Sequence, residues 1–279
     1  KFFVGGGALL DIDLQRYYYA IGIPMYQGYG LSEATPIISA NSPQKHIFGS
    51  SGKVVSPMEI KILDADGVEQ PFGVKGEICI KGENVMAGYW KNPTSTANTI
   101  VDGWLHTGDM GYMRDAEMLY VVGRFKSLLI AADGEKYSPE GIEENLVESS
   151  KYIDGALLHN SQDPYTIALI TPNKEALKVY VKELGLDPET DEAKVKMLEK
   201  LQDEVNMYRR GGRMFGTFPE RWLPAAVCVL PEPWTEQNHF LNSSMKVVRG
   251  RVEEAYKANM EFAYTPEGKN IVNEMNLAS

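Results

Sequence analysis

The pattern of apolar and polar residues changes character along the chain, starting with an α/β region. Residues 1–45 begin with a short apolar strand at Phe2–Val4 and a run of three glycines. Leu9 to Ala20 then has helical spacing, and Ile23–Tyr29 reads as a second strand. This order of strand, helix and strand predicts an α/β unit.

Residues 46–122 have a different pattern, in which short alternating runs are separated by turns. The runs include MEIKILDADG, GEICIKG and EMLYVVG. Asp66-Gly67 lies between alternating segments and is a strong hairpin signal. We therefore expect a small β-rich unit, barrel-like or a sheet, over residues 46–123.

From residue 124 onward the pattern mixes helices and strands. Ser138-Pro139-Glu140 predicts a helix start, with serine as N-cap and proline at the first position. ALLHN, TIALIT and AAVCVLP read as strands, whereas residues 174–208 are charged and helical. The sequence thus predicts a mixed α/β and α+β fold in three parts, 1–45, 46–123 and 124–279.

Composition narrows the class of protein. The 279 residues are 43% hydrophobic and 24% charged, which is ordinary for a globular chain with a sizeable core. The net charge of −10 argues against a nucleic-acid partner, because phosphate binding requires a basic face. No apolar run reaches the roughly 18 residues that span a bilayer, so no transmembrane segment is expected.

The two cysteines, Cys79 and Cys228, have neither metal-site nor disulfide spacing. That usage fits a reducing compartment, so we expect a cytoplasmic protein and leave open a peripheral membrane contact.

The stretch YQGYGLSEAT combines small, aromatic and acidic residues. The glycines around Tyr29, among them Gly30, would let a ligand approach the backbone and lie on the ring. Ser32 can donate to a phosphate, and Glu33 is a hard oxygen ligand suited to Mg²⁺. A strand end with a surface glutamate is an equally good interpretation of this stretch alone.

Three further stretches carry candidate chemistry. Asp109 in WLHTGDMGY could accept both hydroxyls of a ribose, although a plain hairpin turn is the simpler interpretation. Arg124 and Lys126 could grip a ribose or phosphate at a domain junction, or could be solvated charges. Lys246, after a Ser-Ser loop, could reach a phosphoryl oxygen or could lie on the solvent face of a helix.

The order of these motifs is more specific than any one of them. The chain contains in succession GGGALL, QGYGLSEAT, GEICIKGENVMAGYWKNPTST, DGWLHTGDMGY, VVGRFKSLLI with DGEKYSPEGIE, and SSMKVVRGRV. This series resembles the core motifs of the acyl-adenylate-forming (AMP-binding) superfamily, which includes acyl-CoA synthetases, adenylation domains of peptide synthetases and luciferases. The resemblance covers nearly the whole chain except 174–222 and the tail after Ala255. QGYGLSEATP and the closing MKVVR look most like the long-chain fatty acid CoA ligases.

The resemblance implies a site for ATP and AMP in the first half of the chain. Ser32 would touch the α-phosphate, and Glu33 would coordinate Mg²⁺. Asp109 would bind the ribose hydroxyls, with Arg124 close to the same ribose. The adenine side of the nucleotide would be held by Gly6, Gly7, Ala8, Tyr29 and Gly30.

The resemblance also implies a mobile C-terminal domain and a two-step reaction. Lys126 matches the hinge, and Lys246 matches the lysine that stabilises charge during adenylation. Gly134, Glu135 and Lys136 match the loop that enters the site for thioester formation and lines the CoA channel. The fatty carboxylate would attack the α-phosphorus of ATP and release pyrophosphate, and the thiol of CoA would then displace AMP.

Several positions depart from the family pattern. No Ser/Thr/Gly-rich phosphate loop precedes GGGALL, so we expect the C-terminal half of a ligase, inactive alone, with residues 1–45 ending a large N-terminal lobe. Relatives often have a lysine where Ile130-Ala131 stand, Gly-Gly in place of Asp133-Gly134, and threonine and proline near Asn242. Two alternatives remain: an adenylating domain for an aryl or amino acid, and a non-catalytic nucleotide-binding relative.

Overall fold

The computed structural model describes residues 1–7, 10–243 and 245–279, which form two compact units. The first unit is Lys1–Ser127 and the second is Leu128–Ser279. Each unit has its own buried apolar core.

One mixed sheet organises the first unit. In spatial order its strands are β1 (Phe3–Gly5), β2 (Met25–Gly30), β3 (Ile37–Ala40), β4 (Gly52–Val54), β9 (Met118–Arg124), β8 (Trp104–Met113), β6 (Gly76–Lys81) and β5 (Glu59–Leu63), with β7 (Ile100–Val101) attached to β8. β1 and β2 run parallel, and the other neighbours are antiparallel.

The expected α/β beginning of the chain is confirmed. Helix α1 (Ile12–Ala20) connects β1 to its parallel neighbour β2, as a parallel pair requires a crossover. Asp11 caps α1 because its Oδ1 accepts hydrogen bonds from the amides of Asp13 and Leu14. A second helix, α2 (Pro93–Thr99), is capped by Asn92 and precedes β7.

The β-rich region is an open sheet, so the expectation of a barrel-like unit is wrong. Among the described residues the pairing ends at β1 on one side and at β5 on the other, and no strand joins these two edges. The sheet also runs across residue 45, because β3 pairs with β4. Alternation along a strand marks which face is buried, but it carries no information on whether the sheet closes.

The second unit contains a three-stranded sheet covered on both faces. Its strands are β12 (Ile153–His159), β13 (Ile167–Pro172) and β14 (Ala226–Val229), with β13 in the centre. Leu158 and Ile170 belong to one apolar cluster, whereas Leu157 and Leu169 belong to the other. Because successive residues face opposite sides, a strand covered on both faces is apolar throughout, which explains the continuous apolar runs.

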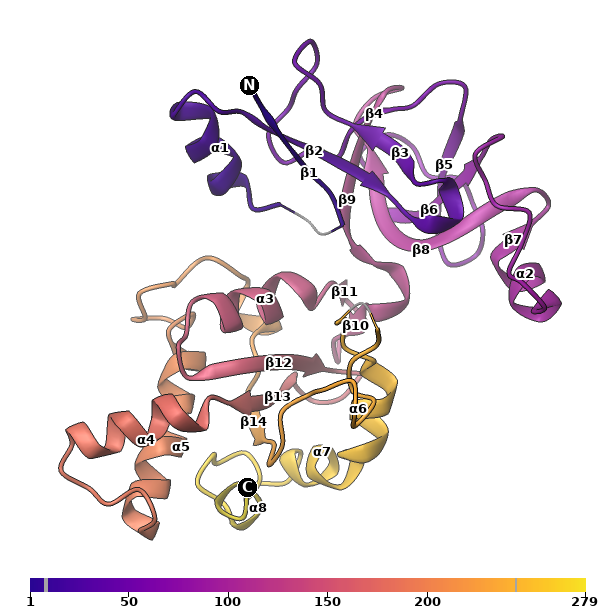
Figure 1. Ribbon diagram of the computed structural model, residues 1–279. Helices are drawn as coiled ribbons and strands as arrows, with labels where there is room; N and C mark the ends of the chain where they lie inside the picture. Colours follow the sequence, from indigo (N-terminus) through magenta and orange to yellow (C-terminus); the bar gives the residue numbers. More distant parts are fainter. Residues whose placement is uncertain (8–9, 244) are drawn as a thin grey trace. The chain divides into compact units, whose positions relative to one another are not determined.

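Helices supply the two covers of this sheet. One cluster includes side chains of α3 (Glu140–Glu148), α4 (Lys174–Glu183), α5 (Asp191–Asn206) and α8 (Glu274–Leu277), and the other includes α6 (Arg249–Ala255) and α7 (Lys257–Ala263). Figure 1 shows α3 and α7 on opposite sides of the strands. A short hairpin of β10 (Leu129–Ile130) and β11 (Lys136–Tyr137) precedes α3. No helix in the described ranges is long and apolar enough to cross a membrane.

The start of α3 differs from the expectation. The N-cap is Pro139 rather than Ser138, and its backbone carbonyl accepts from the amides of Ile142 and Glu143, each at 3.0 Å. Ser138 Oγ is buried with no hydrogen-bond partner among the described atoms. The serine–proline signal therefore located the helix correctly but misassigned its capping residue.

Candidate functional site

Three side chains singled out by the sequence meet at Asp109. The register of β8 and β9 places Asp109 opposite Arg124, whose Nε lies 3.1 Å from Asp109 Oδ1. Tyr29, from β2, donates its hydroxyl to Asp109 Oδ2 at 2.6 Å. β3, β4 and β9 lie between β2 and β8 in the sheet. The sheet must therefore curl strongly for Tyr29 to reach Asp109.

Because this cluster is largely buried, the charge on Asp109 strongly affects the pKa of the side chain that contacts it. Asp109 is 9% exposed, whereas the side chain of Arg124 is half exposed. Burial of Tyr29, and then the negative charge of Asp109 and the hydrogen bond to it, raise the pKa of the Tyr29 hydroxyl. The phenol of Tyr29 therefore stays protonated and can donate its hydrogen bond to Asp109.

The segment of β8 that presents Asp109 is held by the neighbouring strand β6, so the expected hairpin turn at this position is instead an irregular part of a strand. Thr107 Oγ1 donates to the carbonyl of Ile78 at 2.7 Å and accepts from the amide of Asp109 at 3.1 Å. The amide of Gly108 donates to Glu77 Oε1 at 3.0 Å, and Gly108 has φ of 70°, which favours glycine. Sequence reasoning missed Glu77, which looks like an ordinary polar residue of an alternating strand.

Glu33 lies in a 3₁₀ turn, η1 (Ser32–Ala34), directly after β2. Tyr89 donates its hydroxyl to Glu33 Oε1 at 2.9 Å. Asn84 fixes the same turn, because its Nδ2 donates to the carbonyl of Ala34 at 2.8 Å and its carbonyl accepts from Thr35 Oγ1 at 2.7 Å. Sequence reasoning also missed Tyr89, which no local pattern relates to Glu33.

Gly30 is required by a close backbone approach. A Cβ at this position would lie 1.8 Å from the carbonyl oxygen of Pro36. That carbonyl accepts from the amide of Leu31 at 2.8 Å, which folds the chain back over the η1 turn. Ser32 is exposed at this turn. A side chain larger than hydrogen at residue 30 would therefore displace both Ser32 and Glu33.

The glycine loop after β1 is described only in part. Gly6 and Gly7 are exposed, and Ala8 lies outside the described residues. Lys126 lies in the 3₁₀ turn η2 (Phe125–Ser127), one residue before the end of the first unit.

In the second unit, Lys246 lies in a hairpin whose described residues are 241–243 and 245–247. Leu241 and Val247 form an antiparallel bridge. The amide of Lys246 donates to Asn242 Oδ1, and the carbonyl of Lys246 accepts from the amide of Asn242, both at 2.9 Å. Lys246 is exposed. The hairpin therefore holds the backbone of Lys246 and presents its side chain to solvent.

Arg249 anchors the chain directly after this hairpin. Its NH2 lies 2.6 Å from Glu143 Oε1 in α3, and its NH1 donates to the carbonyl of Leu158 in β12 at 2.6 Å. Glu143 Oε1 also accepts from the amide of Leu158 at 2.6 Å. The start of α6 is thus tied to both α3 and β12.

The predicted CoA-channel loop is tied to a part of the chain to which the sequence assigned no role. Glu135 Oε1 accepts from Arg221 NH2 at 2.6 Å, and Glu135 Oε2 accepts from Trp222 Nε1 at 3.0 Å. The ring of Trp222 stacks on Tyr137, with centroids 5.0 Å apart. The hydrogen bonds from Arg221 lower the pKa of Glu135 to about 2. Gly134 and Lys136, on either side, are exposed.

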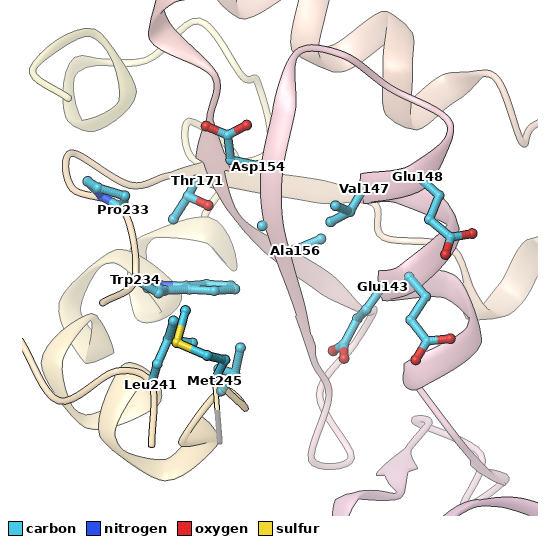
Figure 2. A pocket seen from close by; sticks show the side chains of 13 residues that line it. Glu143, Val147, Glu148, Asp154, Ala156, Thr171, Pro233, Trp234, Leu241 and Met245 are labelled. Carbon is cyan, nitrogen blue, oxygen red and sulfur yellow. The ribbon is translucent and has the colours of Figure 1, made fainter. Parts of the chain in front are cut away.

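A cavity of about 470 Å³ lies in the second unit, between α3, β12 and the hairpin that carries Lys246 (Figure 2). Trp234, Leu241 and Met245 form an apolar wall, and carboxylates such as Glu148 and Asp154 lie at its edge. Because carboxylates repel phosphate groups, we do not assign a nucleotide to this cavity.

Comparisons with known proteins agree on one family. Residues 1–90 match the family model of the AMP-binding enzymes. The chain is 30% identical over 276 residues to a probable acyl-activating enzyme 16, chloroplastic, of Arabidopsis thaliana, covering 94% of this chain and 37% of that protein. It is 35% identical over 218 residues to the long-chain-fatty-acid–CoA ligase ACSBG1 of Rattus norvegicus, covering 77% of this chain and 28% of that protein.

A solved structure gives the same result. The O-succinylbenzoate coenzyme A synthetase of Bacillus subtilis, in complex with ATP and a magnesium ion, superposes with a TM-score of 0.65 and 25% identity, over 91% of this chain and 46% of that one.

The fold is therefore the mixed α/β fold of acyl-activating enzymes. The chain belongs to the AMP-binding, adenylate-forming superfamily. It spans less than half the length of each of these three relatives.

Proposed function

We propose that this chain carries the ribose- and metal-binding side of an ATP-dependent long-chain fatty acid CoA ligase, together with its C-terminal domain. The complete enzyme would form an acyl-adenylate and pyrophosphate, and then acyl-CoA and AMP. The proposal rests chiefly on the cluster at Asp109, where Tyr29 and Arg124 hold one carboxylate in a member of this superfamily.

Asp109 has the properties that a ribose-binding carboxylate needs. A diol is best recognised by a carboxylate of fixed orientation, since each oxygen must accept from a separate hydroxyl. Tyr29 contacts one oxygen of Asp109 and Arg124 the other, which fixes the plane of the group. Arg124 would then lie beside the bound ribose, where its half-exposed guanidinium can also attract the phosphates.

The residues around Glu33 fit a magnesium ion. Mg²⁺ usually binds proteins through one or two carboxylates and keeps its waters and substrate phosphates as the other ligands. Glu33 supplies one carboxylate, oriented by Tyr89, and it is only partly buried. When bound, the ion would neutralise charge on the phosphates of ATP. The exposed hydroxyl of Ser32 lies next in sequence and would donate to the α-phosphate.

Lys246, Lys126 and the loop at residues 134–136 would serve the two half-reactions. The exposed Lys246 would supply positive charge to the phosphoryl oxygens while the acid attacks, because such catalysis consists mostly of positioning and charge stabilisation. Gly134, Glu135 and Lys136 would take part in thioester formation with CoA. A change of backbone conformation at Lys126 would switch the C-terminal domain between the arrangements that the two half-reactions need.

Long-chain fatty acid is our first choice of substrate, and an aryl acid is the second. The fatty acid is favoured by QGYGLSEATP and by the 35% identity to a long-chain-fatty-acid–CoA ligase. The aryl acid is favoured by the structural likeness to an O-succinylbenzoate coenzyme A synthetase.

ATP–pyrophosphate exchange tests the proposal on a full-length protein containing this chain and on the chain alone. Palmitate and O-succinylbenzoate should be compared, with circular dichroism to confirm folding. We expect exchange with palmitate, by the full-length protein only. Asp109→Asn should abolish most of it, whereas Asp66→Asn, at an exposed hairpin, should not. Exchange only with O-succinylbenzoate would select the second substrate, and none with either acid would reject both.

A further inference from the structure

A second cluster of potential ligands lies on the face of the first sheet that points away from its apolar core. The antiparallel register of β6 and β8 places Cys79 opposite His106, and Glu77 lies two residues before Cys79 on the same face. Cys79 Sγ is 3.5 Å from His106 Nδ1, and the same nitrogen is 2.8 Å from Glu77 Oε2. One ligand atom from each of the three side chains lies within 4.8 Å of the others.

These distances suit a tetrahedral metal centre. With metal–sulfur bonds of about 2.3 Å and metal–nitrogen bonds of about 2.0 Å, tetrahedral angles put sulfur and nitrogen ~3.5 Å apart. That is the separation of Cys79 Sγ and His106 Nδ1. Only the carboxylate of Glu77 must move, from a hydrogen bond with the imidazole to a position beside it.

The hydrogen bonds of Glu77 explain why this residue and His106 are present, but they do not explain the thiol of Cys79. Glu77 Oε1 accepts from the amide of Gly108, and Oε2 pairs with the imidazole, which explains a carboxylate and a histidine at these positions. An apolar side chain would serve equally well at Cys79, which is 0% exposed. A thiol directed at the same imidazole nitrogen is the additional observation that points to a metal.

We propose that Glu77, Cys79 and His106 form a binding site for a soft divalent cation such as Zn²⁺, with a fourth position open to water. As the metal–sulfur bond forms, Cys79 releases its thiol proton to solvent. The imidazole of His106 binds through Nδ1, with its ring proton on Nε2. Carboxylate and thiolate together balance the two charges of the cation, so the buried site stays neutral.

The surroundings of Cys79 include one nearby positive charge and a route by which a cation can enter. Lys61 lies opposite Cys79 in the register of β5 and β6, and its ammonium sits 3.8 Å from the ring centre of Trp104. Burial, and then the negative charge of Glu77, raise the pKa of the Cys79 thiol to about 12 despite Lys61, so the incoming metal must displace the thiol proton, and the charge of Lys61 opposes the cation directly. The side chain of His106 is 29% exposed, so a cation can enter along the imidazole.

Titration with Co²⁺, in buffer without thiols, tests the site on the whole chain. Bound Co²⁺ should give a thiolate-to-metal charge-transfer band together with the visible bands of tetrahedral cobalt, and Zn²⁺ should displace both. Cys79→Ser should abolish the charge-transfer band, and His106→Gln should weaken binding. The matched control is Cys228→Ser, which replaces the other buried cysteine and should leave the spectrum unchanged.

Each outcome decides on the metal site independently of any reaction of the protein with ATP. Absence of the band in wild-type protein that is folded by circular dichroism would overturn the proposal. A band lost in Cys228→Ser but kept in Cys79→Ser would also overturn it. If Cys79→Ser fails to fold, His106→Gln and displacement by Zn²⁺ still decide, because cobalt bound elsewhere would not respond to His106.

Discussion

At the scale of single residues, Tyr29 has two separate properties that both concern the nucleotide. Its hydroxyl holds Asp109 Oδ2 at 2.6 Å, while its ring is the surface proposed for adenine. Glycines at positions 28 and 30 flank it, and Gly30 admits no side chain because of the carbonyl of Pro36. A tyrosine at this position would therefore orient the proposed ribose acceptor and contact the base at the same time.

Two substitutions at Tyr29 separate these properties. Tyr29→Phe keeps the ring and removes one hydrogen bond to a carboxylate, so AMP affinity should fall by about fivefold, equivalent to about 1 kcal/mol. Tyr29→Ala also removes the ring and should weaken binding further. Isothermal titration calorimetry with AMP on the full-length protein measures both. Equal affinities for the two variants would show that the ring does not contact the base.

At the scale of elements, two side-chain contacts fix the loops that carry the proposed chemistry of the second unit. Arg249 ties the chain after the Lys246 hairpin to α3 and β12, and Glu135 ties the β10–β11 turn to η3 (Glu220–Trp222). In both cases the partner lies far away in the sequence. The loops are thus held by contacts that the local sequence pattern does not reveal.

The pair of Arg249 and Glu143 should be important for stability. Both side chains are largely buried, so Arg249→Met leaves a carboxylate without its cation and should lower the free energy of unfolding by about 3 kcal/mol. Urea denaturation measures the change. Arg251→Met, on the exposed side of the same helix, is the control and should change stability little. A small effect at Arg249 would mean that water replaces the guanidinium at Glu143.

The contribution of Glu135 to the free energy of unfolding should depend on pH. Its pKa is lowered from 4.5 to about 2 in the folded chain, so the carboxylate stabilises the fold above pH 4.5. That contribution is lost as the pH falls toward about 2, because the folded state must then take up a proton. The difference in unfolding free energy between wild type and Glu135→Gln, measured by denaturation across this range, should shrink with acidification. A difference in unfolding free energy that stays constant with pH would contradict the lowered pKa of Glu135.

At the scale of the whole molecule, the residues proposed to bind the nucleotide and metal lie in one unit, and Lys246 and the loop proposed for thioester formation lie in the other. The ribose and metal candidates lie in Lys1–Ser127, and Lys246 and the CoA-channel loop lie in Leu128–Ser279. Three expectations from the sequence stay predictions. They are a hinge at Lys126 with two states, domain boundaries at residues 45 and 123, and a cytoplasmic location.

Lys246→Ala in the full-length protein tests the division of roles. Removing one charge-stabilising group from the adenylation step should slow pyrophosphate exchange by about a hundredfold. AMP binding should be unchanged if the ribose site lies entirely in the first unit. Lys257→Ala, an exposed lysine on α7, is the control. Unchanged exchange in Lys246→Ala would remove this residue from the mechanism.

The sequence alone determined the α/β beginning of the chain, the apolar strands of the second sheet and the membership of the superfamily. The strands and the helix follow from local patterns, since burial of a strand or helix face is encoded within about ten residues, whereas the resemblance to the superfamily follows from the order of motifs along the chain. Local patterns made Tyr29, Glu33, Asp109 and Arg124 candidates, and their roles stay predictions.

Only the tertiary structure decided which of these residues meet. Tyr29 reaches Asp109 because the sheet curls, and Tyr89 reaches Glu33 from a position 56 residues away. The sheet stays open although its strands alternate like those of a barrel, and Cys79 faces His106 only through the register of β6 and β8. Curvature and register depend on loops and on packing between distant strands, and no local pattern of residues specifies them.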